Sequence, residues 1–170
     1  MCANWRVSRR KSSFGAVVRD DTRILILGSL PGERSLAERR YYAHPQNRFW
    51  YLVGKVIDRD LASLDYDARL AALLDAGVGL WDTVGTAKRD GSLDASIREA
   101  EHNPLADLVA DLPQLRAVGF NGKTSHKIGM PQLTHTDIAL VPLPSSSPAY
   151  AAMPVAEKEK RWLALREFLA

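Results

Sequence analysis

The chain has 170 residues, of which 46% are hydrophobic and 25% charged, and this composition is ordinary for one soluble globular domain. No apolar run approaches the roughly 20 residues of a membrane-spanning helix, and the single cysteine, Cys2, excludes both an internal disulfide and a cluster held by four cysteines. The basic residues 1–11 lack the apolar core of a secretion signal, so we expect a cytoplasmic protein. The net charge of +3 is mild, but arginines gather in residues 34–48, and such clustering favours a polyanionic ligand.

The pattern of elements along the chain predicts one α/β domain. We expect residues 1–20 to form an N-terminal arm and residues 21–170 to form a single domain. Four short apolar runs predict buried strands, at residues 24–27, 78–81, 117–120 and 138–141. Helical periodicity or helix-start signals occupy the intervals, at residues 47–57, 67–76 and 103–112, after residue 124, and from residue 154 onward. Strands that alternate with helices predict a three-layer αβα fold around a central, mostly parallel four-stranded sheet.

The most informative segment, residues 28–50, directly follows the first predicted strand and reads G-S-L-P-G-E-R-S-L-A-E-R-R-Y-Y-A-H-P-Q-N-R-F-W. In open α/β sheets, ligands bind in loops at the ends of buried strands. Phe49 and Trp50 fall on an apolar helical stripe, so we expect both in the core. Tyr41 and Tyr42 precede that helix beside arginines, and we expect one of the two rings to be exposed, where it can stack on a base.

A second loop, residues 143–150, follows the last predicted strand and reads L-P-S-S-S-P-A-Y. Two prolines stiffen it, and small residues allow the backbone to approach a phosphate closely. Taken by itself, the loop is more typical of a Pro/Ser turn before a helix than of a phosphate site.

Several other kinds of site are disfavoured. The turn after the first strand has no G-x-G-x-x-G and no P-loop lysine, which argues against a dinucleotide or nucleoside triphosphate. The four histidines lack the spacing of zinc ligands, and the serines lack the G-x-S-x-G of hydrolases. We therefore expect neither a cofactor nor a metal.

Two motifs carry a resemblance to a known family. After the first strand stands G-x-x-P-G, followed by Y-Y-x-H-P-x-N-x-F-W, and after the last strand stands P-S-S-S-P-A. Together they resemble the uracil-DNA glycosylase superfamily. The chain is most similar to its hypoxanthine-DNA (deoxyinosine) glycosylase branch, also described as family six, because the first motif begins G-S-x-P and because residues 79–82, 91–94 and 120–123 are also similar.

This resemblance implies a monofunctional glycosylase of base-excision repair, acting as a monomer on double-stranded DNA. Such an enzyme flips out a deaminated base, here most readily hypoxanthine, and hydrolyses its N-glycosidic bond to leave an abasic site. Asp82 is also a candidate water-activating carboxylate by its position at the end of the second strand. The implied site residues are Asn47 and Asp82 for catalysis; Gly28, Ser29, Tyr42 and Trp81 for base binding; and Ser145, Ser146, Ser147, Pro148 and Lys123 for DNA binding.

The chain departs from the family pattern at two positions. At Leu30 the mismatch-specific branch has a water-positioning Asn and the ordinary uracil branch has Asp. Leu143 likewise stands where the mismatch-specific branch has Asn. Because leucine cannot orient water, the resemblance places catalysis on Asn47, the residue assigned to it in the hypoxanthine branch. Two alternatives stay open: a uracil enzyme, including one for G:U mismatches, and an inactive DNA-binding member of the same fold.

Overall fold

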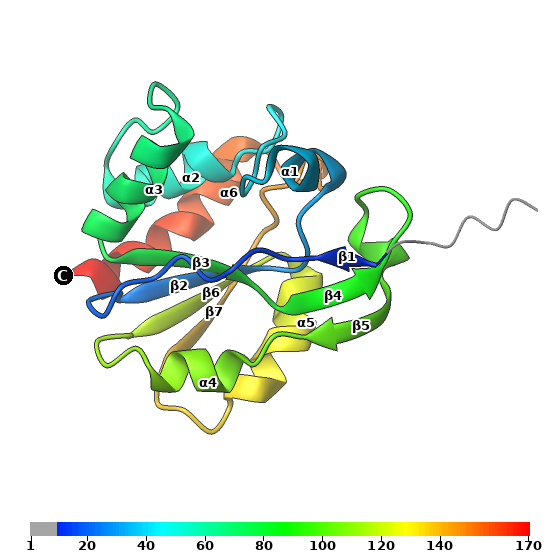
Figure 1. Cartoon of the computed structure of the whole chain (residues 1–170). Coiled ribbons are helices and arrows are strands. Elements are labelled where there is room, and N and C mark those ends of the chain that lie inside the picture. The colour runs from blue at the N-terminus through cyan, green and yellow to red at the C-terminus, as the bar shows by residue number, and fades with distance from the viewer. Residues whose placement is uncertain (1–9) are drawn as a thin grey trace, which may run out of the picture.

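The computed structural model describes residues 10–170 (Figure 1), so the first part of the expected arm lies outside the described residues. The four predicted strands are confirmed and form one wholly parallel sheet in the order β3-β2-β6-β7. The strands are β2 (Ile24–Gly28), β3 (Val78–Asp82), β6 (Ala117–Asn121) and β7 (Ala139–Leu143). Since β2 pairs with β3 on one side and with β6 on the other, the chain direction across the sheet reverses at β2, where open α/β sheets form ligand crevices.

Helices cover both faces of this sheet, as the sequence predicts (Figure 1). The helices on one face, which Figure 1 shows above the sheet, are α1 (Glu33–Glu38), α2 (Phe49–Ile57), α3 (Tyr66–Asp75) and α6 (Val155–Trp162), which continues into the 3-10 helix η2 (Leu163–Leu169). The helices on the other face are α4 (Leu105–Ala110) and α5 (Lys123–Leu133). No helix among residues 10–170 has the length and apolarity needed to cross a membrane.

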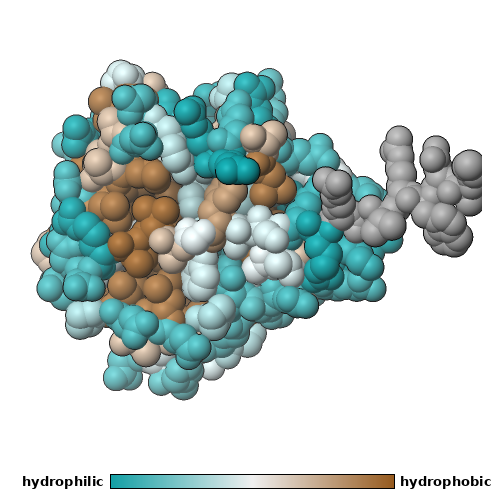
Figure 2. Space-filling model, in the orientation of Figure 1, coloured by the Kyte–Doolittle hydropathy of each residue, from teal (hydrophilic) through white to brown (hydrophobic). Residues whose placement is uncertain are grey.

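Alternation along β2 divides the core in two. Ile24 and Ile26 pack toward α2, α3 and α6, whereas Leu25 and Leu27 pack toward α4 and α5, and all four side chains are fully buried. A strand that is buried on both faces is apolar at every position. For this reason the sequence of β2 shows a continuous apolar run. Figure 2 shows apolar residues gathered over the sheet between α3 and α4, with polar residues around them.

A second, three-stranded antiparallel sheet was not predicted. Its strands, in spatial order, are β1 (Lys11–Ser12), β4 (Val84–Lys88) and β5 (Arg98–His102), and the loop between β4 and β5 contains the 3-10 helix η1 (Asp94–Ser96). The β5 sequence R-E-A-E-H is polar and mostly exposed, so its strand pairing left no hydrophobic pattern. The described part of the expected arm packs on the domain, because β1 pairs with β4 and Val17 forms a bridge with Leu80.

Candidate functional site

A pocket of about 730 Å³ opens at the carboxyl ends of the parallel strands. Each strand contributes a residue at its end: Gly28, Asp82, Asn121 and Leu143. The register places Gly28 beside Asp82 and Asn121 beside Leu143, so side chains from distant parts of the sequence converge at one edge. This is the expected position of a ligand site in an open α/β sheet.

The structure brings all but one of the sequence-predicted site residues together around this pocket. The predicted residues that line it are Gly28, Ser29, Tyr42, Asn47, Asp82, Lys123, Ser145, Ser146, Ser147 and Pro148. Trp81 does not line it. Successive strand residues point to opposite faces, and the Trp81 indole Nε1 donates to the Phe14 carbonyl (3.0 Å) while its ring packs on the α4–α5 side. We therefore remove Trp81 from the base-binding set.

Tyr42 provides a fixed aromatic wall. Its ring stacks on Phe49 with centroids 3.8 Å apart and an angle of 15° between the planes, which leaves the other ring face for a ligand. The backbone of Tyr42 is held at φ 53°, a left-handed conformation that is unusual for a bulky residue. Its carbonyl accepts from Trp50 Nε1 (3.2 Å). Phe49 and Trp50 are buried, as expected from the apolar stripe.

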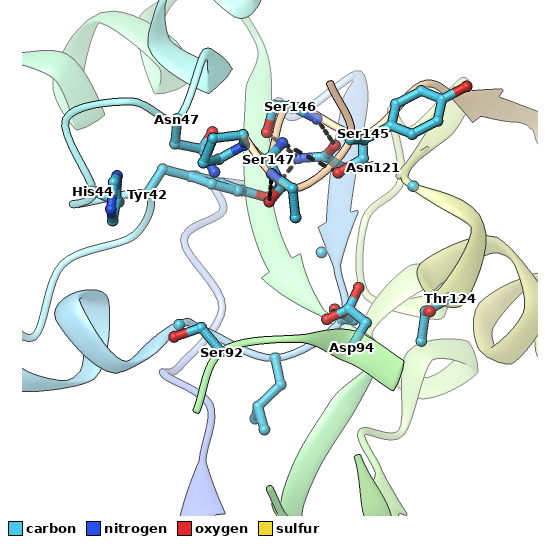
Figure 3. Close-up of a pocket in the computed structure, with 18 of the residues that line it drawn as sticks. Tyr42, His44, Asn47, Ser92, Asp94, Asn121, Thr124, Ser145, Ser146 and Ser147 are labelled. Atoms are coloured by element: carbon cyan, nitrogen blue, oxygen red, sulfur yellow. Dashed lines mark hydrogen bonds between the residues drawn. The ribbon is translucent and has the colours of Figure 1, made fainter. Parts of the chain in front are cut away.

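Asn121 joins the tyrosine to the serine-rich loop, as the dashed lines in Figure 3 show. Its Nδ2 donates to Ser146 Oγ (2.9 Å) and to the Tyr42 hydroxyl (3.3 Å), and its Oδ1 accepts from the Ser146 amide (2.9 Å). The side chain is 8% exposed, so these are buried bonds that fix the geometry strongly. The Arg48 amide also donates to the Ser146 carbonyl (3.0 Å), and this bond ties the two sequence motifs together directly.

The three serines of the loop therefore differ in what they can do. Ser146 is 1% exposed, its amide and hydroxyl oxygen bond to Asn121, and its carbonyl accepts from the Arg48 amide, so it holds the loop in position. Ser145 and Ser147 are half-buried at the pocket and accept bonds from the amides two residues onward, at 3.1 and 3.2 Å. Because both hydroxyl oxygens act as acceptors in these bonds, each hydroxyl still has its own proton to donate to a ligand in the pocket.

Asn47 lies two residues before the start of α2. Its Oδ1 accepts from the Phe49 amide (2.9 Å), which fixes the carboxamide next to the helix. Figure 3 shows the side chain beside Tyr42 and across the pocket from Ser92 and Asp94. Among residues 10–170 the bond to the Phe49 amide is the one hydrogen bond of the carboxamide, so the second lone pair of Oδ1 and the two Nδ2 protons are left for a water molecule or a ligand.

The Asp82 carboxyl is buried, with 3% exposure, at the base of the pocket. Gly28 makes room for it: a Cβ on Gly28 would lie 2.7 Å from Asp82 Oδ1 and 3.1 Å from the Tyr42 hydroxyl. Burial raises the pKa of Asp82 to about 8; the neighbouring Asp94 adds to the rise, and Arg89 opposes it. A carboxyl with such a pKa holds its proton at neutral pH.

Asp94 and Arg89 complete this buried group. Ser29 Oγ donates to Asp94 Oδ1 (2.6 Å), and burial raises the pKa of Asp94 while the Ser29 bond and Arg89 lower it. The Arg89 guanidinium, 2% exposed, donates to the carbonyls of Leu30, Pro31 and Gly91. It therefore holds the turn after β2 against the β4–β5 loop.

Leu30 contributes no polar group to the site. Its side chain is 6% exposed and packs with Val84 and Ala87 in a small apolar cluster, although the residue also borders the pocket. The position where related branches carry a polar residue is thus an apolar part of the pocket lining.

Sequence reasoning gave no site role to Asn121, Asp94 or Arg89. Asn121 directly follows the predicted strand 117–120, and both Asn121 and Asp94 lie in stretches similar to the hypoxanthine branch, so both had a signal in their position. Arg89 had no such signal, because an arginine that follows a polar stretch of sequence is usually an exposed surface charge. Within residues 10–170, no group of three or more His, Cys, Asp or Glu side chains is arranged to hold a metal ion.

A three-layer αβα sandwich with a pocket between the 28–50 and 143–150 loops is the architecture of a uracil-DNA-glycosylase-like domain. Residues 15–168 match the family described as the uracil DNA glycosylase superfamily, and the chain belongs to this superfamily.

Two relatives, both named hypoxanthine DNA glycosylase, are similar to the chain. The protein from Methanosarcina barkeri is 45% identical over 116 residues, which are 68% of this chain and 73% of the relative. The protein from Methanosarcina acetivorans is 39% identical over 139 residues, which are 82% and 87% of the two chains. The fold is similar to the solution NMR structure of a candidate uracil DNA glycosylase from Methanosarcina acetivorans, with a TM-score of 0.86, 36% identity, and coverage of 95% of this chain and all of that one.

Proposed function

We propose that this protein is a monofunctional DNA glycosylase that removes hypoxanthine from deoxyinosine in double-stranded DNA, acting as a cytoplasmic monomer through a single domain of residues 21–170. The observation that carries the proposal is the pocket itself, which joins the Tyr42 ring, the Asn47 carboxamide and a buried acid. The names of the two Methanosarcina relatives support hypoxanthine as the base.

The pocket suits a planar base rotated out of the duplex. Stacking on an aromatic side chain stabilises a bound base by about 1–3 kcal/mol. The free face of Tyr42 can provide this contact without moving, because Phe49 supports the ring from behind. Gly28 and Ser29 bring the end of β2 against the edge of the base, where backbone groups can form hydrogen bonds with it.

The rim of the pocket suits the DNA backbone. Lys123, exposed at the start of α5, lies on the rim with Ser145, Ser147 and Pro148. A helix N-terminus with a lysine and hydroxyl groups is a favourable place for a phosphate. We assign Ser146 to holding this loop in place, through Asn121, and not to contact with phosphate.

Hydrolysis requires a water at the C1′ carbon while the sugar gains oxocarbenium character. Asn47 is fixed at the pocket by its bond to the Phe49 amide, and we propose that its carboxamide orients this water. A carboxamide is a weak base, but an oxocarbenium-like carbon needs only a weakly activated nucleophile. No amine nucleophile is required by this scheme, and we therefore expect no strand cleavage.

A panel of duplexes tests the substrate. Each duplex carries a single deoxyinosine, deoxyuridine or deoxyxanthosine, and alkali converts abasic sites into breaks. We expect breaks chiefly at deoxyinosine and none without alkali. Breaks chiefly at deoxyuridine would establish the uracil alternative. Binding without breaks in any duplex would establish the inactive DNA-binding alternative.

Asn47→Ala tests the role of the carboxamide. We expect the single-turnover rate on the deoxyinosine duplex to fall by at least about 10²-fold, with little change in affinity for a duplex that carries a tetrahydrofuran abasic analogue. Gln46→Ala is the matched control, because Gln46 is an exposed residue of the same loop and is not among the described residues that line the pocket. A normal rate for Asn47→Ala would contradict the assignment.

A further inference from the structure

Two carboxyl groups share one buried cation at the pocket. Asp82 and Arg89 are 3% and 2% exposed, and the half-buried Asp94 acts on both electrostatically. Glu33 also acts on Arg89, but Glu33 is exposed and pairs with Lys11 Nζ (3.3 Å). One guanidinium offsets one carboxylate, whereas a second carboxylate in the same buried space would be repelled by the first. The charge balance therefore favours one carboxylate and one carboxylic acid.

Hydrogen bonds decide which of the two keeps the proton. Asp94 Oδ1 accepts a short bond from the Ser29 hydroxyl (2.6 Å), and this bond stabilises the ionised form. Among residues 10–170, Asp82 Oδ2 is buried and has no hydrogen-bond partner. A charged oxygen in that position would lack any compensation, whereas a protonated one needs only an acceptor, which the ligand can supply.

The other groups that face Asp82 do not provide a second cation. Tyr41 and Tyr42, from the loop before α2, interact electrostatically with Asp82, and burial raises the pKa of both phenols, so both are neutral. Besides these, the charged groups that act on Asp82 are Asp94 in η1 and Arg89 after β4. The groups around Asp82 thus supply only one cation, which Asp94 shares, and the carboxyl of Asp82 keeps its proton.

We infer that Asp82 acts as a general acid toward the departing purine, a role that rests on the proposed function. Asp82 lines the pocket, Gly28 leaves room for its carboxyl, and its Oδ2 is buried without a partner among residues 10–170. Hypoxanthine presents the N7 and N3 ring nitrogens and O6 as acceptors. Asp82 is thus a proton donor and not the water-activating base that its position first suggested.

The C1′–N9 bond breaks and its electron pair passes to the purine, while the Asp82 proton moves to N7, so that the base leaves neutral. The oxygen of a water oriented by Asn47 bonds to C1′. The proton that this water loses returns to the Asp82 carboxylate through solvent, and the products are an abasic sugar and free hypoxanthine.

The dependence of the single-turnover rate on pH tests this role. For the wild-type enzyme on a deoxyinosine duplex, we expect the rate to be constant through the acidic range and to fall above about pH 8, where Asp82 ionises. Asp82→Asn keeps the shape and can donate a hydrogen bond but no proton. We expect it to lower the rate at pH 6 by about 10²-fold and to abolish the alkaline decline.

Two further variants keep the test decisive. Asp94→Asn removes the neighbouring negative charge that helps to raise the pKa of Asp82, and it leaves Arg89 to act on Asp82 alone. Both effects lower the pKa of Asp82, so the alkaline decline should move to lower pH. This shift ties the decline to Asp82 even where Asp82→Asn fails to fold, and a decline that stays in place or moves to higher pH would contradict the inference. Asp137→Asn alters an exposed carboxylate just before β7, at the opposite edge of the sheet, and should leave the profile unchanged.

A wild-type rate that rises through neutral pH, with the rise lost in Asp82→Asn, would make Asp82 a base and overturn the inference. An unaltered rate in Asp82→Asn would also overturn it. Failure of the proposed function looks different, because the wild-type enzyme would then form no abasic site in the deoxyinosine duplex at any pH.

Discussion

At the scale of single residues, the site is built from groups whose ordinary behaviour has been changed by burial. Asp82 holds a proton at neutral pH because it is buried beside a second acid. Ser146, which by sequence is one of three equivalent serines, is fixed from three directions and differs from its neighbours in role. Neither change could be predicted from residue identity, since both depend on contacts across the fold.

The Asp82 carboxyl also makes stability depend on pH. Its pKa rises from 3.8 in the unfolded chain to about 8 in the folded protein, so between these values unfolding releases a proton. The contribution of this residue is fully present below pH 4 and is lost as pH rises toward 8, at about 1.4 kcal/mol per pH unit. Relative to the wild type, Asp82→Asn should therefore gain about 2–3 kcal/mol in free energy of unfolding between pH 5 and pH 7.

Urea unfolding at the two pH values measures this difference. Asp137→Asn, whose carboxyl is exposed, should show no such gain. A constant difference between Asp82→Asn and the wild type across this range would show that Asp82 is ionised in the folded protein.

At the scale of elements, the four parallel strands were predictable because each forms a short, largely apolar run, and β2 and β6 are buried throughout. The small antiparallel sheet was not, because β4 and β5 are short and partly exposed. This difference matters for the site. The β4–β5 loop carries Ser92, Leu93 and Asp94, which line one side of the pocket, so the sequence did not indicate which strands hold that side in place.

The turn between β6 and α5 offers a test at this scale. Gly122 has φ 99°, and a Cβ there would lie 3.2 Å from Ser145 Cβ. Gly122→Ala should therefore lower the free energy of unfolding by about 1–3 kcal/mol. It should also weaken binding to the tetrahydrofuran duplex, because the serine loop must move.

Gly15→Ala is the matched control, since a Cβ added to Gly15 would meet no atom within 4 Å and the φ of this residue is not positive. It should leave both stability and binding unchanged. Equal effects of the two substitutions would show that the loss is not specific to the turn beside the serine loop.

At the scale of the whole molecule, the parallel topology brings two motifs from opposite ends of the chain to one edge of the sheet, where the Arg48 amide and the Ser146 carbonyl join them. The sequence predicted this edge as the site because both motifs follow buried strands. It could not predict that Leu30 would be part of a core cluster, or that a buried acid would stand at the base of the pocket. The chemistry we propose arises from this assembly and not from either motif alone.

The most direct measurement of the central claim is the identity of the released base. One duplex with a single deoxyinosine and one with a single deoxyuridine are incubated together with the protein, and the free bases are separated and identified by mass. We expect hypoxanthine to be released in an amount equal to the alkali-labile sites formed in the deoxyinosine strand. Release of uracil as the main product, or of no base at all, would contradict it.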